Sequence, residues 1–171
     1  MKRMDERQLV SAFLAGDERA FRALYDAHAP ALYAFIRRLL GRWNSEANDA
    51  LQDVWLRAAR DLPRFRGDSA FRTWLFGIGV NRCREILRLV ANPHEEFEDC
   101  GTTPVLDERI DLERAVAMLP SRYREVVILH DIYEYTHSEI GAMLGIDEGT
   151  SKSNLSRARA RLRQSIGAKH G

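Results

Sequence analysis

The sequence has only two cysteines and no apolar run of the ~18 residues that a membrane-spanning helix needs. Charges at Asp5, Glu6 and Asp17 interrupt the N-terminal segment, which therefore has no signal-peptide core. Cys83 and Cys100 lack the CxxC spacing of a metal or redox motif. We expect a cytoplasmic protein with free thiols and without a disulfide; a redox role for either thiol stays open.

Glycine and proline are also scarce, with 11 and 5 among 171 residues, and no fixed-period repeat is present. These residues are too few for a low-complexity chain, and the lack of a repeat excludes solenoids and propellers. Hydrophobic residues make up 45% of the chain. This fraction is enough to form the core of one domain or of two small ones.

The net charge of only +1 conceals a strong asymmetry along the chain. Residues 1–91 carry 16 basic and 11 acidic side chains, a net charge of +5. Residues 92–113 carry one basic and eight acidic side chains (−7), and residues 114–171 carry nine and six (+3). This distribution indicates two basic modules separated by an acidic connector.

Apolar residues recur at three- and four-residue spacings, without the alternation that is typical of a strand. The period predicts two helices within residues 9–40, broken at Gly16 and with a kink or boundary near Pro30. Further helices are predicted over residues 45–60 and 69–90, and four more after the acidic segment. We therefore predict an all-α fold of two small helical domains.

The segment from Asn92 to about Asp107 combines turn-forming residues with clustered acids and has no apolar period, as is typical of a flexible linker. We divide the chain into an N-terminal domain (residues 1–91), a linker (92–110) and a C-terminal domain (111–171). The acidic linker could mimic nucleic acid in a basic channel or serve only as a soluble spacer, and the sequence favours neither.

The C-terminal domain contains a helix-turn-helix signature. Thr136 and Glu139 have capping-box spacing at a helix start, and Gly145 can adopt the left-handed conformation that ends this helix. Asp147 then caps a second helix, and residues 148–171 carry six basic side chains and one acidic one. Two short helices joined by so brief a turn, the second one basic, are typical of DNA binding.

Short hydroxyl side chains let a helix approach phosphates, and long basic side chains reach base edges in the major groove. The predicted duplex-binding residues are Thr136, Thr150, Lys152, Ser153, Ser156, Arg157 and Arg159. The alternative is a solvated basic helix that only covers the core. The coincidence of capping box, turn and basic face at motif spacing disfavours it.

Taken together, these blocks resemble the extracytoplasmic-function (ECF) sigma factors, compact bacterial sigma factors that retain only the second and fourth conserved regions. The fourth region, which reads the minus-35 promoter element, is similar to LPSRYREVVILHDIYEYTHSEIGAMLGIDEGTSKSNLSRARARLR. The second region is similar to NDALQDVWLRAAR and FRGDSAFRTWLFGIGVNRCREILR. The resemblance covers nearly the whole chain. It implies a factor that binds core RNA polymerase, directs promoter-specific initiation and is held inactive by an anti-sigma factor.

The resemblance also implies roles in the N-terminal domain. The helix over residues 45–60 would dock on the coiled coil of the largest polymerase subunit through Asp49, Gln52, Asp53 and Arg57. Without the resemblance, an ordinary solvated face explains the same four residues better. The loop after this helix and the start of the next one would read and melt the minus-10 element. Its predicted residues are Arg64, Phe65, Arg66, Arg72 and Asn81.

Each of these residue types has chemistry that suits an opened strand. Phe65 can stack on an unpaired base, which is worth ~1 to 3 kcal/mol, and the arginines can neutralise phosphates. Asn81 can offer paired hydrogen bonds to a base edge. Trp74 could also stack on a base, but its spacing from Phe71 and Ile78 favours core packing.

Five positions depart from the family pattern or from helix propensity. Ser151 occupies a usually apolar position and Asn154 replaces a common basic residue, so we expect a different minus-35 preference. Asn48 interrupts an acidic run that often precedes the polymerase-binding helix. Gly77 and Gly79 lie inside a predicted helix, where each costs up to ~1 kcal/mol relative to alanine. Close helix packing would explain the two glycines.

Two other classes of function fit parts of the sequence. A stand-alone dimeric repressor or activator would use the helix-turn-helix but leave residues 1–91 unexplained. An enzyme has little support, because the chain lacks a complete nucleotide-binding glycine loop, GKS or GKT, and HExxH. His130, Asp131 and His137 have no recognised metal-ligand spacing. We therefore expect no catalytic residue, no cofactor and no metal.

Overall fold

The computed structural model describes residues 5–90 and 108–167, and every regular element in these two ranges is helical. The N-terminal elements are α1 (Glu6–Leu14), α2 (Glu18–Leu40), η1 (Gly41–Glu46), α3 (Ala47–Asp61), η2 (Leu62–Arg64) and α4 (Phe71–Val90). The C-terminal elements are α5 (Glu108–Ala117), α6 (Ser121–Val127), η3 (Ile128–Ile132), α7 (His137–Leu144) and α8 (Glu148–Gly167). The prediction of an all-α fold with two helical domains is confirmed. None of the described helices is both long enough and apolar enough to cross a membrane.

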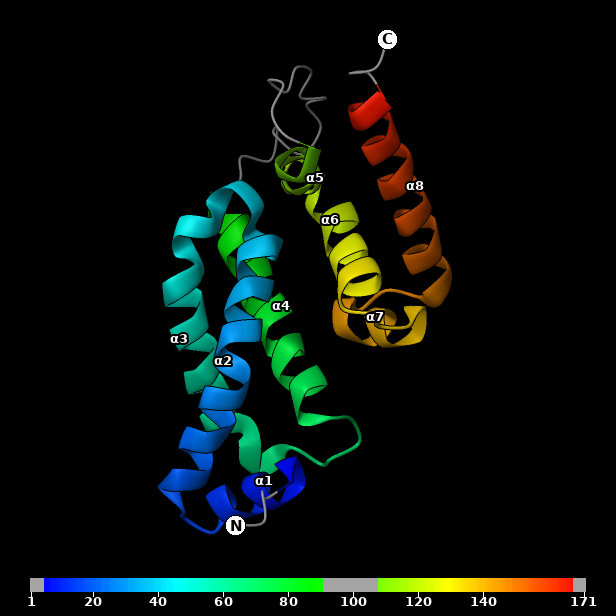
Figure 1. Ribbon diagram of the computed structural model, residues 1–171. Helices are drawn as coiled ribbons and strands as arrows, with labels where there is room; N and C mark the ends of the chain where they lie inside the picture. Colours follow the sequence, from blue (N-terminus) through cyan, green and yellow to red (C-terminus); the bar gives the residue numbers. More distant parts are fainter. Residues whose placement is uncertain (1–4, 91–107, 168–171) are drawn as a thin grey trace.

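In the N-terminal domain, α2, α3 and α4 pack against one another lengthwise, and α1 packs against α2 (Figure 1). The predicted break falls between α1 and α2, where Gly16 has a φ of +96°. The side chains of Asp5 and Asp17 cap the two helix starts. The helix α2 continues through Pro30, so the boundary considered near this residue is absent.

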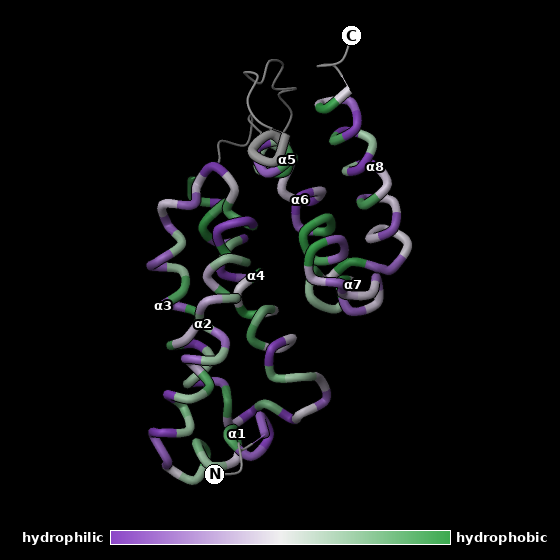
Figure 2. The backbone as a smooth tube through the Cα atoms, in the orientation of Figure 1, coloured by the Kyte–Doolittle hydropathy of each residue, from purple (hydrophilic) through white to green (hydrophobic). Residues whose placement is uncertain are grey.

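Hydrophobic and hydrophilic residues alternate along α2 and α4 (Figure 2), and most of the hydrophobic ones are buried. Gly79 lies where these helices approach closely, because a Cβ atom there would be 3.3 Å from Leu32 Cδ1. Close packing therefore explains Gly79. It does not explain Gly77, whose Cβ would meet nothing within 4 Å.

In the C-terminal domain, α6 and α7 both pack against α8 (Figure 1). Between α6 and α7 the chain forms one π-helical turn, η3. Residues 92–107 of the predicted linker (92–110) lie outside the described residues. The helix α5 begins at Glu108, so the end of the predicted linker is helical.

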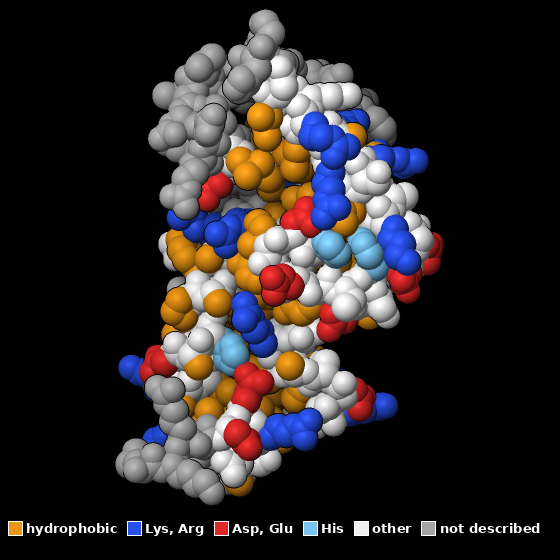
Figure 3. Space-filling view, turned by 45° about the vertical axis from the view of Figure 1, so that its right-hand side comes forward, with side chains coloured by type: hydrophobic (Ala, Val, Ile, Leu, Met, Phe, Trp, Pro, Cys, Tyr) orange, Lys and Arg blue, Asp and Glu red, His pale blue; other side chains and the backbone are white. Residues whose placement is uncertain are grey.

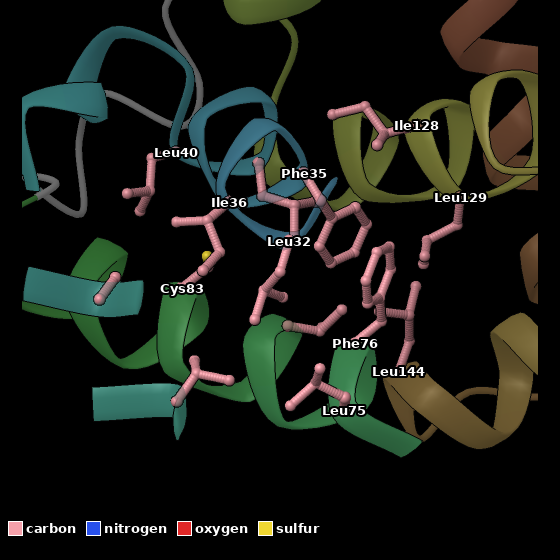
Figure 4. Close-up of a cluster of buried hydrophobic side chains, with 14 of the residues drawn as sticks. Leu32, Phe35, Ile36, Leu40, Leu75, Phe76, Cys83, Ile128, Leu129 and Leu144 are labelled. Atoms are coloured by element: carbon pink, nitrogen blue, oxygen red, sulfur yellow. The ribbon is translucent and has the colours of Figure 1, made fainter. Parts of the chain in front are cut away.

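The hydrophobic cores of the two domains are continuous (Figure 4). Phe35 of α2 stacks on Phe76 of α4 with ring centroids 4.5 Å apart. Tyr133, which follows η3, packs edge-on against both rings, at 5.0 Å and 5.6 Å. Leu129 and Leu144 of the C-terminal domain join the same cluster. Two domains that are separate in sequence thus share one buried core.

Candidate nucleic-acid interface

The helix-turn-helix is held by two local hydrogen-bonded caps. Thr136 Oγ1 accepts from the Glu139 amide (3.2 Å), and Glu139 Oε2 accepts from the Thr136 amide (2.8 Å). Gly145 has φ +66° and ψ +36°, the left-handed conformation that ends α7. Asp147 then accepts from the amide (2.7 Å) and hydroxyl (2.8 Å) of Thr150. The predicted capping box, turn and second cap are confirmed.

The turn also depends on a glycine that the sequence analysis did not single out. A Cβ atom at Gly141 would lie 2.7 Å from the Ile146 carbonyl oxygen. Only a residue without a side chain lets the turn fold back this closely on α7. Gly141 therefore sets the angle at which α8 leaves the turn. Its position one turn before Gly145 was the available signal.

One exposed face of α8 carries four of the predicted DNA-binding residues: Lys152, Ser153, Ser156 and Arg157. Their spacing places them on the same side of the helix, opposite the buried Leu155 and Ala158. Lys152 Nζ lies 2.8 Å from Glu148 Oε1, but both side chains are more than half exposed, so this pair contributes little stability. Arg157 forms no ion pair with any described residue. The four side chains are exposed, so this face can contact a ligand, and Lys and Arg side chains are prominent on the side of the molecule that includes α8 (Figure 3).

The other three predicted residues make intramolecular contacts instead. Thr136 and Thr150 use their hydroxyl groups in the two caps. Arg159 forms a two-bond ion pair with Asp131 of η3, at 3.1 Å and 2.6 Å. These residues hold the helix-turn-helix together in the structure. Of the other four, the Ser153 hydroxyl donates to the Thr150 carbonyl oxygen on its own helix (3.1 Å), and Ser156 and Arg157 have exposed side chains.

Ser151, a departure from the family pattern, is fully buried between α7 and α8. Its Oγ lies 2.9 Å from His137 Nδ1, so the buried hydroxyl has a polar partner. The His137 ring stacks on His130 at 4.6 Å, and burial lowers the pKa of His137 below its ordinary value. In the described ranges, no three His, Cys, Asp or Glu side chains are placed to hold a metal.

The predicted minus-10 residues divide between a loop and a helix. Arg64 and Arg66 are exposed on either side of Phe65. The Phe65 ring is half-buried and packs on Trp74 (centroids 5.0 Å apart) and Phe71 (6.2 Å). Trp74 therefore contributes to packing, as its spacing indicates, and is also the surface on which Phe65 rests.

The two remaining residues of this set lie on α4. Asn81 is exposed, more than two turns beyond Arg72. The Arg72 guanidinium lies over the rings of Phe76 (5.0 Å) and Tyr133 (5.9 Å). Arg72 is thus exposed to solvent and also contacts the C-terminal domain through Tyr133.

The four residues of the predicted polymerase-binding face of α3 also fall into two groups. Arg57 donates to both carboxylate oxygens of Glu85 on α4, at 2.8 Å and 2.7 Å. Asp53 Oδ2 lies 2.8 Å from Arg82 Nε, an ion pair without the geometry of a hydrogen bond. The hydrogen bonds from Arg57 are the main reason why the pKa of Glu85 falls to about 2. Asp53 and Arg57 therefore fasten α3 to α4.

Asp49 and Gln52 are the members of this set that are exposed to solvent. Leu56, one helical turn beyond Gln52, has 70% of its surface exposed. A single exposed leucine is common on protein surfaces, and Leu56 is of interest because it lies on the same helix face as Gln52. The sequence analysis missed Leu56, although its position among charged residues of an amphipathic helix was a signal.

Comparison with known proteins places these elements in one family. Residues 24–91 match Sigma-70 region 2, and residues 109–162 match Sigma-70, region 4. The ECF RNA polymerase sigma factor SigM of Mycobacterium tuberculosis is 38% identical over 167 residues, which cover 95% of this chain and 85% of the relative. The chain belongs to the ECF family of RNA polymerase sigma factors. This family consists of transcription regulators that bind core polymerase and promoter DNA, which confirms the predicted class of function.

Two solved sigma-factor structures resemble this sigma factor over most of its length. CnrH in complex with the cytosolic domain of CnrY is 29% identical, with a TM-score of 0.70, covering 95% of this chain and 97% of that chain. RpoE in complex with the anti-sigma factor NepR, from Bartonella quintana, is 30% identical, with a TM-score of 0.67, covering 86% and 96%.

Proposed function

We propose that α8 anchors this sigma factor on duplex DNA at the minus-35 element, while the loop before α4 captures an unpaired base of the minus-10 element. The observation that carries the proposal is the exposed face of Lys152, Ser153, Ser156 and Arg157, which directly follows a tight, capped turn. A recognition helix enters the major groove with such a face near its N-terminus.

The residues of this face have different roles in DNA binding. Arg157, which is exposed and unpaired among the described residues, reaches a base edge, and a well-placed contact of this kind discriminates by ~1 to 3 kcal/mol. The serines let the helix backbone approach phosphates. Thr136, Thr150 and Arg159 act through the contacts that hold α7, η3 and α8 in position.

At the minus-10 element, Phe65 exchanges its partner. In the free sigma factor its ring rests on Trp74; on opened DNA it stacks on a base, while Arg64 and Arg66 neutralise neighbouring phosphates. Asn81 contacts a base edge further along α4. The surface of Trp74 already accommodates the ring of Phe65, so it needs little rearrangement to accept a flat base.

On α3, the polymerase-binding surface consists of Asp49, Gln52 and Leu56, and Asp53 and Arg57 position this surface by pairing with α4. Leu56 adds apolar area at its centre. Asp49 and Gln52, at the rim of this surface, orient the sigma factor on polymerase.

The sigma factor itself catalyses no reaction and needs no cofactor in this proposal, because polymerase supplies the chemistry. It acts in the cytoplasm, where core polymerase is. Control by an anti-sigma factor is part of the proposal, supported by the similarity to RpoE, which was solved in complex with the anti-sigma factor NepR.

Run-off transcription with core polymerase and a promoter library tests the duplex-reading half. Arg157→Ala is expected to lose minus-35 discrimination by ~1 to 3 kcal/mol, or about 5- to 150-fold. Arg163→Ala removes an exposed basic residue further along α8 and should initiate like wild type. Equal initiation by both variants would contradict the assignment. A symmetric footprint over two half-sites without polymerase would favour a stand-alone repressor instead.

Phe65→Ala tests the melting half. The variant holoenzyme is expected to bind duplex promoter as wild type does but to open it poorly, since a stacked base is worth ~1 to 3 kcal/mol. Permanganate reactivity of unpaired thymines measures opening separately from binding. Normal opening on a promoter that binds normally would remove Phe65 from the site.

A further inference from the structure

The helix α1 lies outside the part of the chain that matches Sigma-70 region 2, which covers residues 24–91. It is nevertheless a well-formed part of the N-terminal domain, since a capping box closes its start and Val10 is buried. It packs against α2 and against η2, the turn that leads directly into Phe65 (Figure 1). The helix α1 is therefore a neighbour of the loop that we assign to the minus-10 element.

One close polar contact joins α1 to α2. Nε2 of His28 on α2 lies 2.6 Å from Oε1 of Glu6 in the first turn of α1. The His28 side chain is only 15% exposed, so most of its hydration is lost in the folded chain. A polar ring at such a position needs a polar partner, and Glu6 supplies it. The contact therefore holds the ring of His28 in place as well as docking α1 on α2.

The ring of His28 also packs on the first residue of α4. Its centroid lies 5.4 Å from that of Phe71. Phe71 is 4% exposed and contacts the rings of Trp74 (5.7 Å) and Phe65 (6.2 Å). Centroid separations of this size are those of favourable aromatic pairs. Phe71 is thus the buried link between His28 and the two rings of the minus-10 loop.

The orientation of the Trp74 ring depends on this link. Trp74 and Phe65 are both half-buried, whereas Phe71 is buried between them and His28. A half-buried ring keeps its orientation through the neighbours on which it packs, and stacking on a base depends on the orientation of the ring plane. A shift of Phe71 would therefore turn the surface on which an unpaired base is captured.

We propose that Glu6 and His28 are positioning residues for base capture at the minus-10 element. Their contact holds Phe71, and Phe71 holds Trp74 in the orientation that accepts a base. Neither Glu6 nor His28 touches the DNA. This inference rests on the proposed function, because it takes the surface of Trp74 as the one that receives the base. It gives α1 a role in promoter opening.

A positioning role separates two properties that a general loss of stability would lower together. The duplex-reading face lies on α8 in the C-terminal domain, so weaker positioning at Phe71 leaves duplex binding unchanged. Capture of an unpaired base becomes weaker, because the ring that receives it is no longer held at one angle. Binding to the two forms of DNA therefore distinguishes positioning from stability.

The test measures the affinity of the holoenzyme for a single-stranded minus-10 oligonucleotide and, separately, for a duplex that carries only the minus-35 element. Glu6→Ala and His28→Ala are compared with wild type. Glu18→Ala is the matched control, because Glu18 is also the first residue of a helix and is exposed. We expect Glu6→Ala and His28→Ala to bind the oligonucleotide about 2- to 10-fold more weakly, the effect of one aromatic contact, and to bind the duplex as wild type does. Glu18→Ala should bind both as wild type does.

The double variant Glu6→Ala/His28→Ala tests whether the two residues act in one line. Because Glu6 acts through His28, the double variant should bind the oligonucleotide no more weakly than His28→Ala alone. Additive losses would mean that α1 acts by another route and would overturn the proposal. Circular dichroism checks the helix content of each variant. If His28→Ala loses helix content, Glu6→Ala decides alone, since the Glu6 side chain is 37% exposed.

Two further results would overturn the proposal. One is an oligonucleotide affinity of Glu6→Ala and His28→Ala equal to that of wild type. The other is an equal loss for oligonucleotide and duplex, which a general loss of stability produces. Phe65→Ala separates these results from a failure of the proposed function. If Phe65→Ala binds the oligonucleotide normally, the proposed function fails; if it alone binds weakly, only the positioning role of Glu6 and His28 fails.

Discussion

Gly79 of α4 lies directly beneath Leu32 of α2, so close that an added Cβ would approach Leu32 Cδ1 to 3.3 Å. Gly79→Ala should therefore destabilise the domain by ~1 to 3 kcal/mol through overpacking. Gly77→Ala is the matched control, because its Cβ meets nothing within 4 Å, and it should stabilise α4 by ~0.5 to 1 kcal/mol. Urea unfolding of both variants measures the difference. Equal effects would mean that the helices do not touch at Gly79.

The Arg57 and Glu85 pair predicts a specific acid sensitivity. Hydrogen bonds from Arg57 lower the pKa of Glu85 from 4.5 to about 2, so the folded state favours the charged carboxylate. The stabilisation is complete above about pH 4.5 and is lost as the pH falls toward 2. Glu85→Gln should be less stable at pH 7 and lose less stability between these pH values, whereas Glu46→Gln, at an exposed position, should behave like wild type. Identical acid profiles for wild type and Glu85→Gln would disprove this role.

His137 predicts a second pH dependence at milder acidity. Burial is the main cause of its lowered pKa, and the neighbouring His130 and Lys152 add to it, while Glu148 opposes them. The neutral ring is the form that the fold favours, so its contribution is complete above about pH 6.5 and declines as the pH falls through the lowered pKa. The midpoint of thermal unfolding should fall between pH 7.5 and 5, and less so in His137→Asn. The same slope in both proteins would assign the effect elsewhere.

Cys83 should be chemically silent in the folded protein. It is 2% exposed, and burial raises the pKa of its thiol to about 12, so almost no thiolate is present at pH 7. With Cys100→Ser as background, since Cys100 lies outside the described residues, Ellman's reagent should label Cys83 only as fast as the chain unfolds. Rapid labelling under native conditions would reopen a redox role for this residue.

Leu56 should matter for binding and not for stability. Because 70% of its surface is exposed, Leu56→Ala should change the unfolding free energy by less than ~0.5 kcal/mol. We expect its affinity for core polymerase to fall several-fold, as measured by a fluorescence titration with core polymerase. Leu89→Ala, at a leucine on α4 that is 83% exposed, is the control. Equal affinities for the two variants would place the polymerase surface elsewhere on the domain.

The sequence was sufficient for features that depend on near neighbours in the chain. The helix boundary at Gly16, the capping box of Thr136 and Glu139, and the left-handed Gly145 each follow from residues within four positions of one another. The same applies to the exposed face of α8, because helical period alone separates Arg157 from the buried Leu155.

Contacts between distant segments could not be predicted in the same way. Arg84 and Glu125 are 41 residues apart, and Arg124 and Leu39 are 85 apart. Nothing in the local pattern distinguishes these two arginines from solvated ones. For the same reason, Arg57 was grouped with an exposed face, although its partner Glu85 lies 28 residues away on another helix.

The shared core of Phe35, Phe76 and Tyr133 makes the contact between the two domains sensitive to temperature. Separating the two domains would expose this apolar surface to water, so the separation carries a positive change in heat capacity, and its free energy is a curved function of temperature. The apolar part of the contact weakens on cooling. Cooling therefore shifts the balance of the contact between the domains from ring packing toward the hydrogen bonds between Arg84 and Glu125.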